Sequence, residues 1–135
     1  MPAILKTEKI AVASEEHVVV VRQATRRLAV ELQFSLVDQT KIVTAASELA
    51  RNLLIYGGGG ETCLEVLQEN LRKGLRLHFV DQGPGIPDLD LALRDGYTSG
   101  NGMGLGLGGA KRLVNEFDLK SAPGEGTHVT ITRWK

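Results

Sequence analysis

The sequence predicts a two-layer α/β sandwich, in which a mixed, mostly antiparallel sheet is covered by helices on one face. Two long amphipathic helical segments lie near the N-terminus, and pairs of alternating strand segments follow them. The resulting order β-α-α-β-β-α-α-β-β lacks the regular strand–helix alternation of a dinucleotide-binding sheet. At 135 residues the chain has the size of one domain, and we expect residues 1–135 to form a single one.

The N-terminal part is expected to form one strand and two helices. Residues 4–13 have strand character, and Ser14 is a favourable N-cap for a helix that extends to about Phe34. A second helix is expected from Val37 to Tyr56, where a run of glycines ends it. Apolar residues recur at helical spacing in both segments, so each helix has one core-facing side. These residues are Val18, Val21, Leu28 and Leu32 in the first helix and Ile42, Ala45, Ala46, Leu49 and Leu53 in the second.

The rest of the chain is expected to contain two hairpins separated by helical segments. Alternating apolar residues indicate the strands, and short polar or glycine-containing segments join each pair. Val129 and Ile131 are expected to face the core from the last strand. The strands are expected at 62–69, 74–80, 119–122 and 127–134, and the helices at 88–94 and 105–117.

Composition limits the classes of partner. Sixteen basic and sixteen acidic residues balance, so we expect neither a nucleic-acid partner nor a membrane partner. The N-terminus has no signal-peptide pattern, and Cys63 is the only cysteine, so we expect a cytoplasmic protein without an internal disulfide. His17, His78 and His128 are far apart in sequence, so a structural zinc site is not expected.

Two glycine-rich segments carry the strongest functional signal. Residues 81–86 (Asp-Gln-Gly-Pro-Gly-Ile) end an apolar strand with a carboxylate, and residues 100–109 contain alternating glycines just before a helical segment. Glycine allows close backbone approach, so amide N–H groups can converge on an anion, and a helix N-terminus adds further donors. We therefore expect a pocket that binds phosphates with its backbone and a planar group with Asp81, which indicates a nucleotide.

A carboxylate and an amide lie together on the second predicted helix. Glu48 and Asn52 are four residues apart, so they share one face beside the apolar stripe. An amide oxygen is a suitable Mg²⁺ ligand, and a neighbouring carboxylate can accept a proton from a hydroxyl or a water molecule. This pair alone is a weak signal, and it becomes specific only together with the two glycine-rich segments.

These three segments and Gly126-Thr127 resemble the GHKL (Bergerat) nucleotide-binding fold, which is shared by DNA gyrase, heat-shock chaperones, sensor histidine kinases and mismatch-repair ATPases. Residues 48–52 resemble its N-box, and 81–86 and 102–107 resemble its two glycine boxes. Within this superfamily the short chain is most similar to the bacterial anti-sigma and switch-protein kinases. Residues 47–52, 81–87 and 111–117 carry that similarity.

The resemblance implies ATP and Mg²⁺ as cofactors and assigns roles to individual residues. Asp81 would accept a hydrogen bond from the adenine amino group, and Thr127 would support it. Asn52 would be the Mg²⁺ ligand, and Glu48 the general base for a serine or threonine hydroxyl. The other nucleotide-binding residues that it implies are Gly83, Gly85, Ile86, Gly102, Met103, Gly104, Leu105 and Gly106.

The implied activity is that of a protein serine/threonine kinase in a bacterial stress-response pathway of the stressosome type. Such a kinase phosphorylates a STAS-domain antagonist and, once released, activates a regulatory phosphatase. An anti-sigma factor of the same fold, which acts by sequestration, is the alternative. The segment 88–101 between the glycine boxes has no basic residue just before the second box, so we expect weak intrinsic nucleotide affinity.

Overall fold

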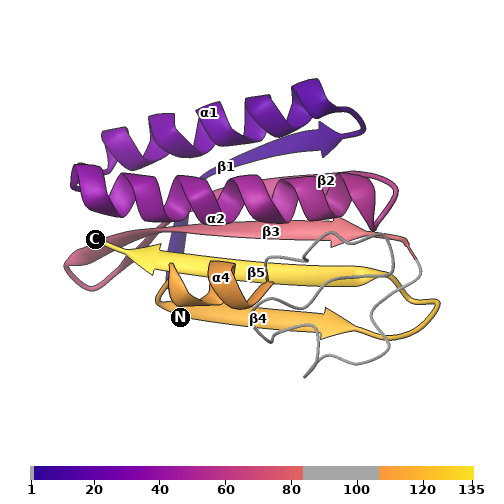
Figure 1. Ribbon diagram of the computed structural model, residues 1–135. Coiled ribbons are helices and arrows are strands. Elements are labelled where there is room, and N and C mark those ends of the chain that lie inside the picture. Colours follow the sequence, from indigo (N-terminus) through magenta and orange to yellow (C-terminus); the bar gives the residue numbers. More distant parts are fainter. Residues whose placement is uncertain (1, 84–106) are drawn as a thin grey trace.

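The computed structural model describes residues 2–83 and 107–135 and shows a five-stranded sheet with helices packed on one face (Figure 1). Its elements are β1 (Ala3–Val12), α1 (Glu15–Glu31), α2 (Leu36–Ile55), β2 (Gly60–Glu69), β3 (Arg72–Asp81), α4 (Leu107–Arg112), β4 (Glu116–Ser121) and β5 (Thr127–Trp134). The strand order is β1-β2-β3-β5-β4, and neighbouring strands in this described sheet pair antiparallel. The predicted two-layer sandwich is confirmed.

The two long helices begin in different ways. Ser14 has the extended backbone of an N-cap, but its side chain makes no capping hydrogen bond. The Nδ1 atom of His17 instead accepts a hydrogen bond from the N–H of Ala13 at 2.9 Å. At the start of α2, the Oγ atom of Ser35 accepts from the N–H of Asp38 at 3.1 Å, as a serine N-cap normally does. The second helix therefore starts at Leu36, one residue before the predicted position.

The core lies between the helices and the covered face of the sheet. All nine apolar stripe residues predicted for the two long helices are buried, as are Val129 and Ile131. They pack against alternate side chains of the central strands, because successive residues of a strand face opposite sides of the sheet. The largest fully buried side chains that the sheet contributes to this core are Leu64, Leu75, Leu77, Phe79 and Ile131.

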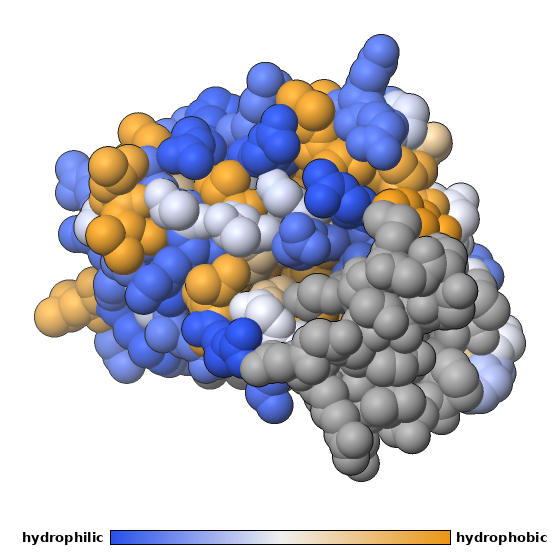
Figure 2. All heavy atoms as spheres, in the orientation of Figure 1, coloured by the Kyte–Doolittle hydropathy of each residue, from blue (hydrophilic) through white to orange (hydrophobic). Residues whose placement is uncertain are grey.

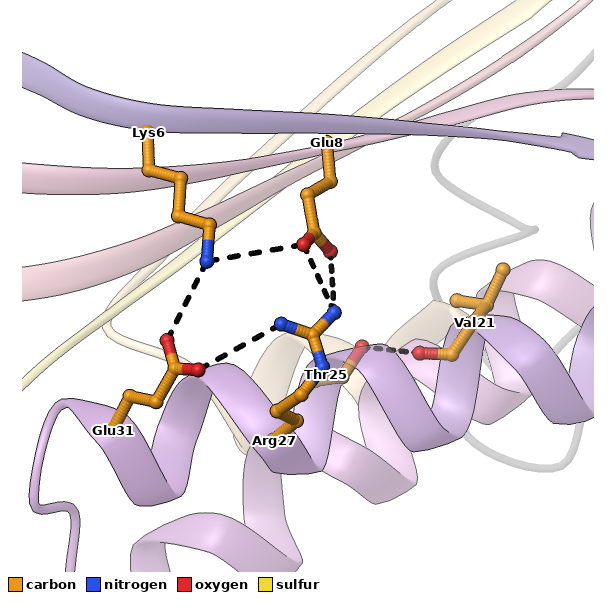
Figure 3. Close-up of polar contacts among 6 residues, drawn as sticks. All are labelled: Lys6, Glu8, Val21, Thr25, Arg27 and Glu31. Atoms are coloured by element: carbon orange, nitrogen blue, oxygen red, sulfur yellow. Dashed lines mark hydrogen bonds and ion pairs between the residues drawn. The ribbon is translucent and has the colours of Figure 1, made fainter.

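A charged network connects β1 with α1 at the surface (Figure 3). The Arg27 guanidinium donates to both carboxylate oxygens of Glu8, at 2.9 and 2.7 Å. The Nζ atom of Lys6 lies 3.7 Å from a Glu31 oxygen, which completes the network between strand and helix. Because these side chains are 27–51% exposed, the network is expected to add little to stability. Beneath it, the buried Thr25 hydroxyl donates to a backbone carbonyl one turn earlier.

The helix predicted at 105–117 is shorter in the structure. Helix α4 ends at Arg112, and β4 begins at Glu116. The N–H of Asn115 donates to a carbonyl of β5, and its Oδ1 accepts from the N–H of Trp134. Sheet pairing therefore takes these residues out of the helix. The helix predicted at 88–94 lies outside the described residues.

On the face of the molecule that Figure 2 shows, hydrophobic residues lie in patches among hydrophilic ones. Among the exposed hydrophobic side chains are Leu36 and Val37 at the start of α2, which are 72% and 62% exposed. Within residues 2–83 and 107–135, no helix combines the length and apolar character that crossing a membrane requires.

Arg133→Met should lower the free energy of unfolding by about 1–2 kcal/mol near neutral pH. The Arg133 guanidinium donates to Asp38 on α2 and to the carbonyl of Leu113, and it lowers the pKa of the Asp38 carboxyl. Because the pKa of Asp38 is lower in the folded state, the ion pair stabilises the fold fully above the unfolded-state pKa of about 4. This stabilisation is lost as the pH falls through the lowered pKa of the folded state. The difference from wild type should therefore shrink in acid.

Urea unfolding at several pH values measures this difference, and Arg26→Met at an exposed position of α1 is the control. A difference that stays constant from neutral pH to strongly acidic pH would contradict the role of the ion pair.

Candidate functional site

A cavity opens between α2 and the neighbouring ends of β3 and β5. Its walls are mostly apolar, with a few polar groups among them, which is typical of a site for a small organic ligand. The residues that line it are Leu49, Asn52, Leu53, Tyr56, Gly57, Phe79, Asp81, Leu107, Thr127 and Val129. Three residues predicted for the site, Asn52, Asp81 and Thr127, thus meet at one cavity.

Asp81 is the last residue of β3, and its side chain is buried, with the residue 8% exposed. One carboxylate oxygen, Oδ1, accepts a hydrogen bond from the N–H of Gly83 at 2.8 Å. A buried carboxylate needs such partners, because burying an unpaired charge is costly. Hydrogen bonding to Gly83 fixes the orientation of the carboxylate at the cavity.

Glycines surround Asp81 where side chains would not fit. A Cβ on Gly57, just after α2, would lie 2.6 Å from the Asp81 carboxylate carbon. A Cβ on Gly126 would lie 2.2 Å from the Asp81 carbonyl oxygen, and Gly126 has a φ of +78°. From the sequence, Gly57 was predicted only to be part of the glycine run that ends the helix. The available signal was its position five residues after Asn52, at the end of the same helix.

Asn52 lies on the cavity-facing side of α2. Its Nδ2 group is buried and has no hydrogen-bond partner among the described residues. A buried unsatisfied donor is costly in a folded protein, so this group fits a ligand oxygen such as that of a phosphate or a water molecule. The amide oxygen of the same side chain is the atom that would bind Mg²⁺.

Glu48 lies one turn before Asn52 on α2, but it does not line the cavity. Its side chain is 42% exposed, and one carboxylate oxygen lies 3.8 Å from the guanidinium of Arg51. Glu48 is thus accessible from solvent on the same helix as Asn52. This position suits a group that meets a second, incoming molecule.

Thr127 begins β5 directly opposite Asp81 in the sheet. Its Oγ1 lies 2.8 Å from the Oγ of Ser121, which donates to the carbonyl of Gly126 at 2.9 Å. Since the single hydroxyl hydrogen of Ser121 is used in that bond, Thr127 donates to Ser121. The Thr127 oxygen then remains an acceptor beside Asp81. Ser121 was not predicted as a site residue, and its place opposite Thr127 on β4 follows only from the strand pairing.

The remaining predicted nucleotide-binding residues lie outside the described part of the chain, and their roles stay predictions. They are Gly85, Ile86, Gly102, Met103, Gly104, Leu105 and Gly106.

Sequence comparisons identify known proteins that are similar to this chain. Residues 37–135 match the family described as histidine kinase-, DNA gyrase B- and HSP90-like ATPase. The serine/threonine-protein kinase RsbT of Bacillus subtilis is 44% identical over 125 residues, which cover 93% of this chain and 94% of that protein. An anti-sigma F factor of Thermoanaerobacter is 24% identical over 84% of this chain and 82% of its own length.

Solved structures show the same fold. The RsbU and RsbW domains of a Mycobacterium tuberculosis protein give a TM-score of 0.67 at 19% identity, over 96% of this chain and 33% of that chain. This chain therefore spans about a third of the length of that solved chain. The SiaB–SiaC complex of Pseudomonas aeruginosa gives a TM-score of 0.55 at 16% identity, over 98% and 91%.

The family match extends over most of the chain, and the identity to RsbT extends over nearly all of it. The resemblance inferred from the N-box and the glycine boxes is confirmed. This chain belongs to the histidine kinase-, DNA gyrase B- and HSP90-like ATPase family and is a close relative of the serine/threonine-protein kinase RsbT.

Proposed function

We propose that this protein is an ATP- and Mg²⁺-dependent protein serine/threonine kinase, in which residues 1–135 act as one domain. The observation that carries the proposal is the meeting of Asn52, Asp81 and Thr127 at one apolar cavity, with Glu48 one helical turn away. The 44% identity to a serine/threonine-protein kinase supports the reaction type.

The adenine ring would enter the apolar part of the cavity beside Phe79 and Val129. Gly83 already occupies Oδ1 of Asp81, which leaves the second carboxylate oxygen for the adenine amino group. A carboxylate only accepts hydrogen bonds, whereas guanine presents a carbonyl at that position. Asp81 would therefore select adenine over guanine, and Thr127 would hold a bridging water molecule beside it.

The phosphates would extend along α2 toward Asn52. The Asn52 amide suits both parts of a magnesium–phosphate group, because its oxygen can bind the cation and its buried Nδ2 can donate to an oxygen. When bound, Mg²⁺ supplies positive charge that stabilises the transferring phosphoryl group.

Glu48 would accept the proton of the substrate hydroxyl as that oxygen attacks the terminal phosphate. Because Glu48 is exposed, a protein substrate can reach its carboxylate. Because Glu48 and Asn52 lie one turn apart on α2, the helix fixes their positions relative to each other. Catalysis would rest mainly on positioning and charge stabilisation, as phosphoryl transfer generally does.

The partners that we propose are a STAS-domain antagonist as substrate and a regulatory serine phosphatase that the released kinase activates. This partner switching would take place in the cytoplasm, in a stress-response pathway of the stressosome type. The similarity to RsbT supports the assignment. The chain's balanced charge gives no indication of a nucleic-acid partner.

An anti-sigma factor is the second candidate, because the similarity to an anti-sigma F factor extends over 84% of this chain. Incubation with γ-labelled ATP and candidate STAS-domain proteins separates the two. Label on a serine or threonine of a STAS-domain protein supports the switch kinase. Stable capture of a sigma factor supports sequestration instead.

Glu48→Gln should reduce phosphotransfer by at least about a hundredfold, because the base is lost, while ATP binding is retained. Single-turnover transfer from labelled ATP and equilibrium titration measure the two effects. Arg51→Gln removes the same ion pair but keeps the carboxylate, so it is the matched control and should retain transfer. Equal losses in both variants would show that the ion pair matters and not the base.

Asp81→Asn should weaken ATP binding by at least about tenfold, since an amide presents a donor where the adenine amino group needs an acceptor. Gly57→Ala should also weaken binding, because its Cβ would displace the Asp81 carboxylate. Titration with ATP and GTP measures both affinity and selectivity. Asp118→Asn, on the exposed edge strand β4, is the control. Wild-type ATP affinity in Asp81→Asn would remove the adenine assignment.

Asn52→Ala should abolish the Mg²⁺ dependence of ATP binding, because the proposed ligand oxygen is removed. Titrations with and without the metal should differ for wild type and coincide for the variant. A variant whose affinity still rises with Mg²⁺ would place the cation on other groups.

A further inference from the structure

A cluster of polar side chains lies on the open face of the sheet, opposite the helices. His78 on β3 is the cross-strand partner of Thr130 on β5, and His128 lies two residues before Thr130, so all three share this face. The Nδ1 atom of His78 is 3.2 Å from the Nε2 atom of His128. The Thr130 Oγ1 is 3.3 Å from each of these nitrogens. The three atoms therefore form a nearly equilateral triangle.

The two Thr130 sides of this triangle are longer than good hydrogen bonds, and all three sides fit the spacing of metal ligands. A hydroxyl that takes part in a good hydrogen bond lies about 2.8 Å from its partner, clearly closer than Thr130 lies to either histidine. Two ligands bound tetrahedrally to Zn²⁺ at about 2.0–2.1 Å are separated by about 3.3–3.4 Å. Each side of the triangle is close to that length.

A carboxylate orients one of the imidazoles. The Nε2 atom of His78 lies 2.6 Å from Oε1 of Glu65, and that oxygen also accepts from Nε of Arg76 at 2.7 Å. Glu65 is only 8% exposed. The Nε2 atom of His78 carries the proton in this pair, so the Nδ1 lone pair points into the triangle. Metal-binding histidines are commonly held by carboxylates in this way.

We propose that His78, His128 and Thr130 form a binding site for a divalent transition-metal ion of the kind that imidazole favours, such as Zn²⁺, Ni²⁺ or Cu²⁺. Two imidazoles are the main ligands, the hydroxyl is a weaker third, and water completes the coordination. In residues 2–83 and 107–135 no group of three or more His, Cys, Asp or Glu side chains is placed to hold a metal. The proposed site has two imidazoles, so water must fill the positions that they and the hydroxyl leave open.

Metal binding requires only a change of tautomer at His128. Without metal, the Nε2–H of His128 donates to Nδ1 of His78. With metal, that proton lies on Nδ1 of His128, so both imidazoles are neutral and present lone pairs. Mg²⁺ prefers oxygen ligands, so the ion proposed to accompany ATP would not compete for this site. His78 and His128 are 50 residues apart in the sequence, which argued against a zinc site, but the pairing of β3 with β5 brings them together.

Calorimetric titration of Zn²⁺ or Ni²⁺ into the tag-free, nucleotide-free chain tests the proposal. We expect one ion per chain. His78→Ala and His128→Ala should each weaken binding by at least about tenfold, and Glu65→Gln by about 10–100-fold through lost orientation of His78. His17→Gln is the matched control, because His17 lies on α1 and binds the backbone of Ala13. It should bind as wild type does.

A second measurement needs no variant. Addition of Zn²⁺ should shift the imidazole resonances of His78 and His128 in NMR spectra of the wild type and leave those of His17 in place. Circular dichroism then establishes that the histidine variants are folded. The proposal is overturned if the wild type takes up no metal, if both histidine variants bind with wild-type affinity, or if His17 is the residue that responds.

Discussion

The buried carboxylate of Asp81 is the constraint on which the architecture of the site depends. Three glycines pack closely around this residue: Gly57 just after α2, Gly83 just after β3 and Gly126 just before β5. They can do so only because Gly57, Gly83 and Gly126 have no side chains. In return, the carboxylate is held by the N–H of Gly83 and directed to the cavity. Packing of the backbone and the proposed recognition of the base therefore depend on the same few atoms.

Most of the fold could be predicted from the sequence because its elements carry local signals. The stripes on the two long helices identify the buried faces, and alternation identifies both hairpins. The end of α4 could not be predicted in this way. Leu113 and Phe117 continue a helical pattern, whereas Asn115 is bound to β5, and that contact depends on residues distant in sequence. Ser14 is the N-cap of α1 as predicted, but its side chain makes no capping hydrogen bond, and the sequence did not indicate that His17 would accept from the N–H of Ala13.

The candidate site, too, could be predicted from the sequence only where its residues form local motifs. The spacing of Glu48 and Asn52 and the carboxylate at the strand end were readable as motifs, and the structure brings Asn52 and Asp81 to one cavity. Gly57 was not recognised, because its role arises from a contact with Asp81 across the fold. Sequence also could not predict the exposure of Glu48, since exposure depends on what packs around the helix.

Helix α2 is held at both of its ends. Arg133 of β5 binds Asp38 in its first turn, and Gly57 packs against Asp81 just beyond its last turn. Its 20 residues span about 30 Å, so the helix is attached to the sheet at two distant points. Twisting it about its axis would break both attachments together. A protein that docked on the exposed side chains of Leu36 and Val37 would therefore move Asn52 only by moving the whole of helix α2.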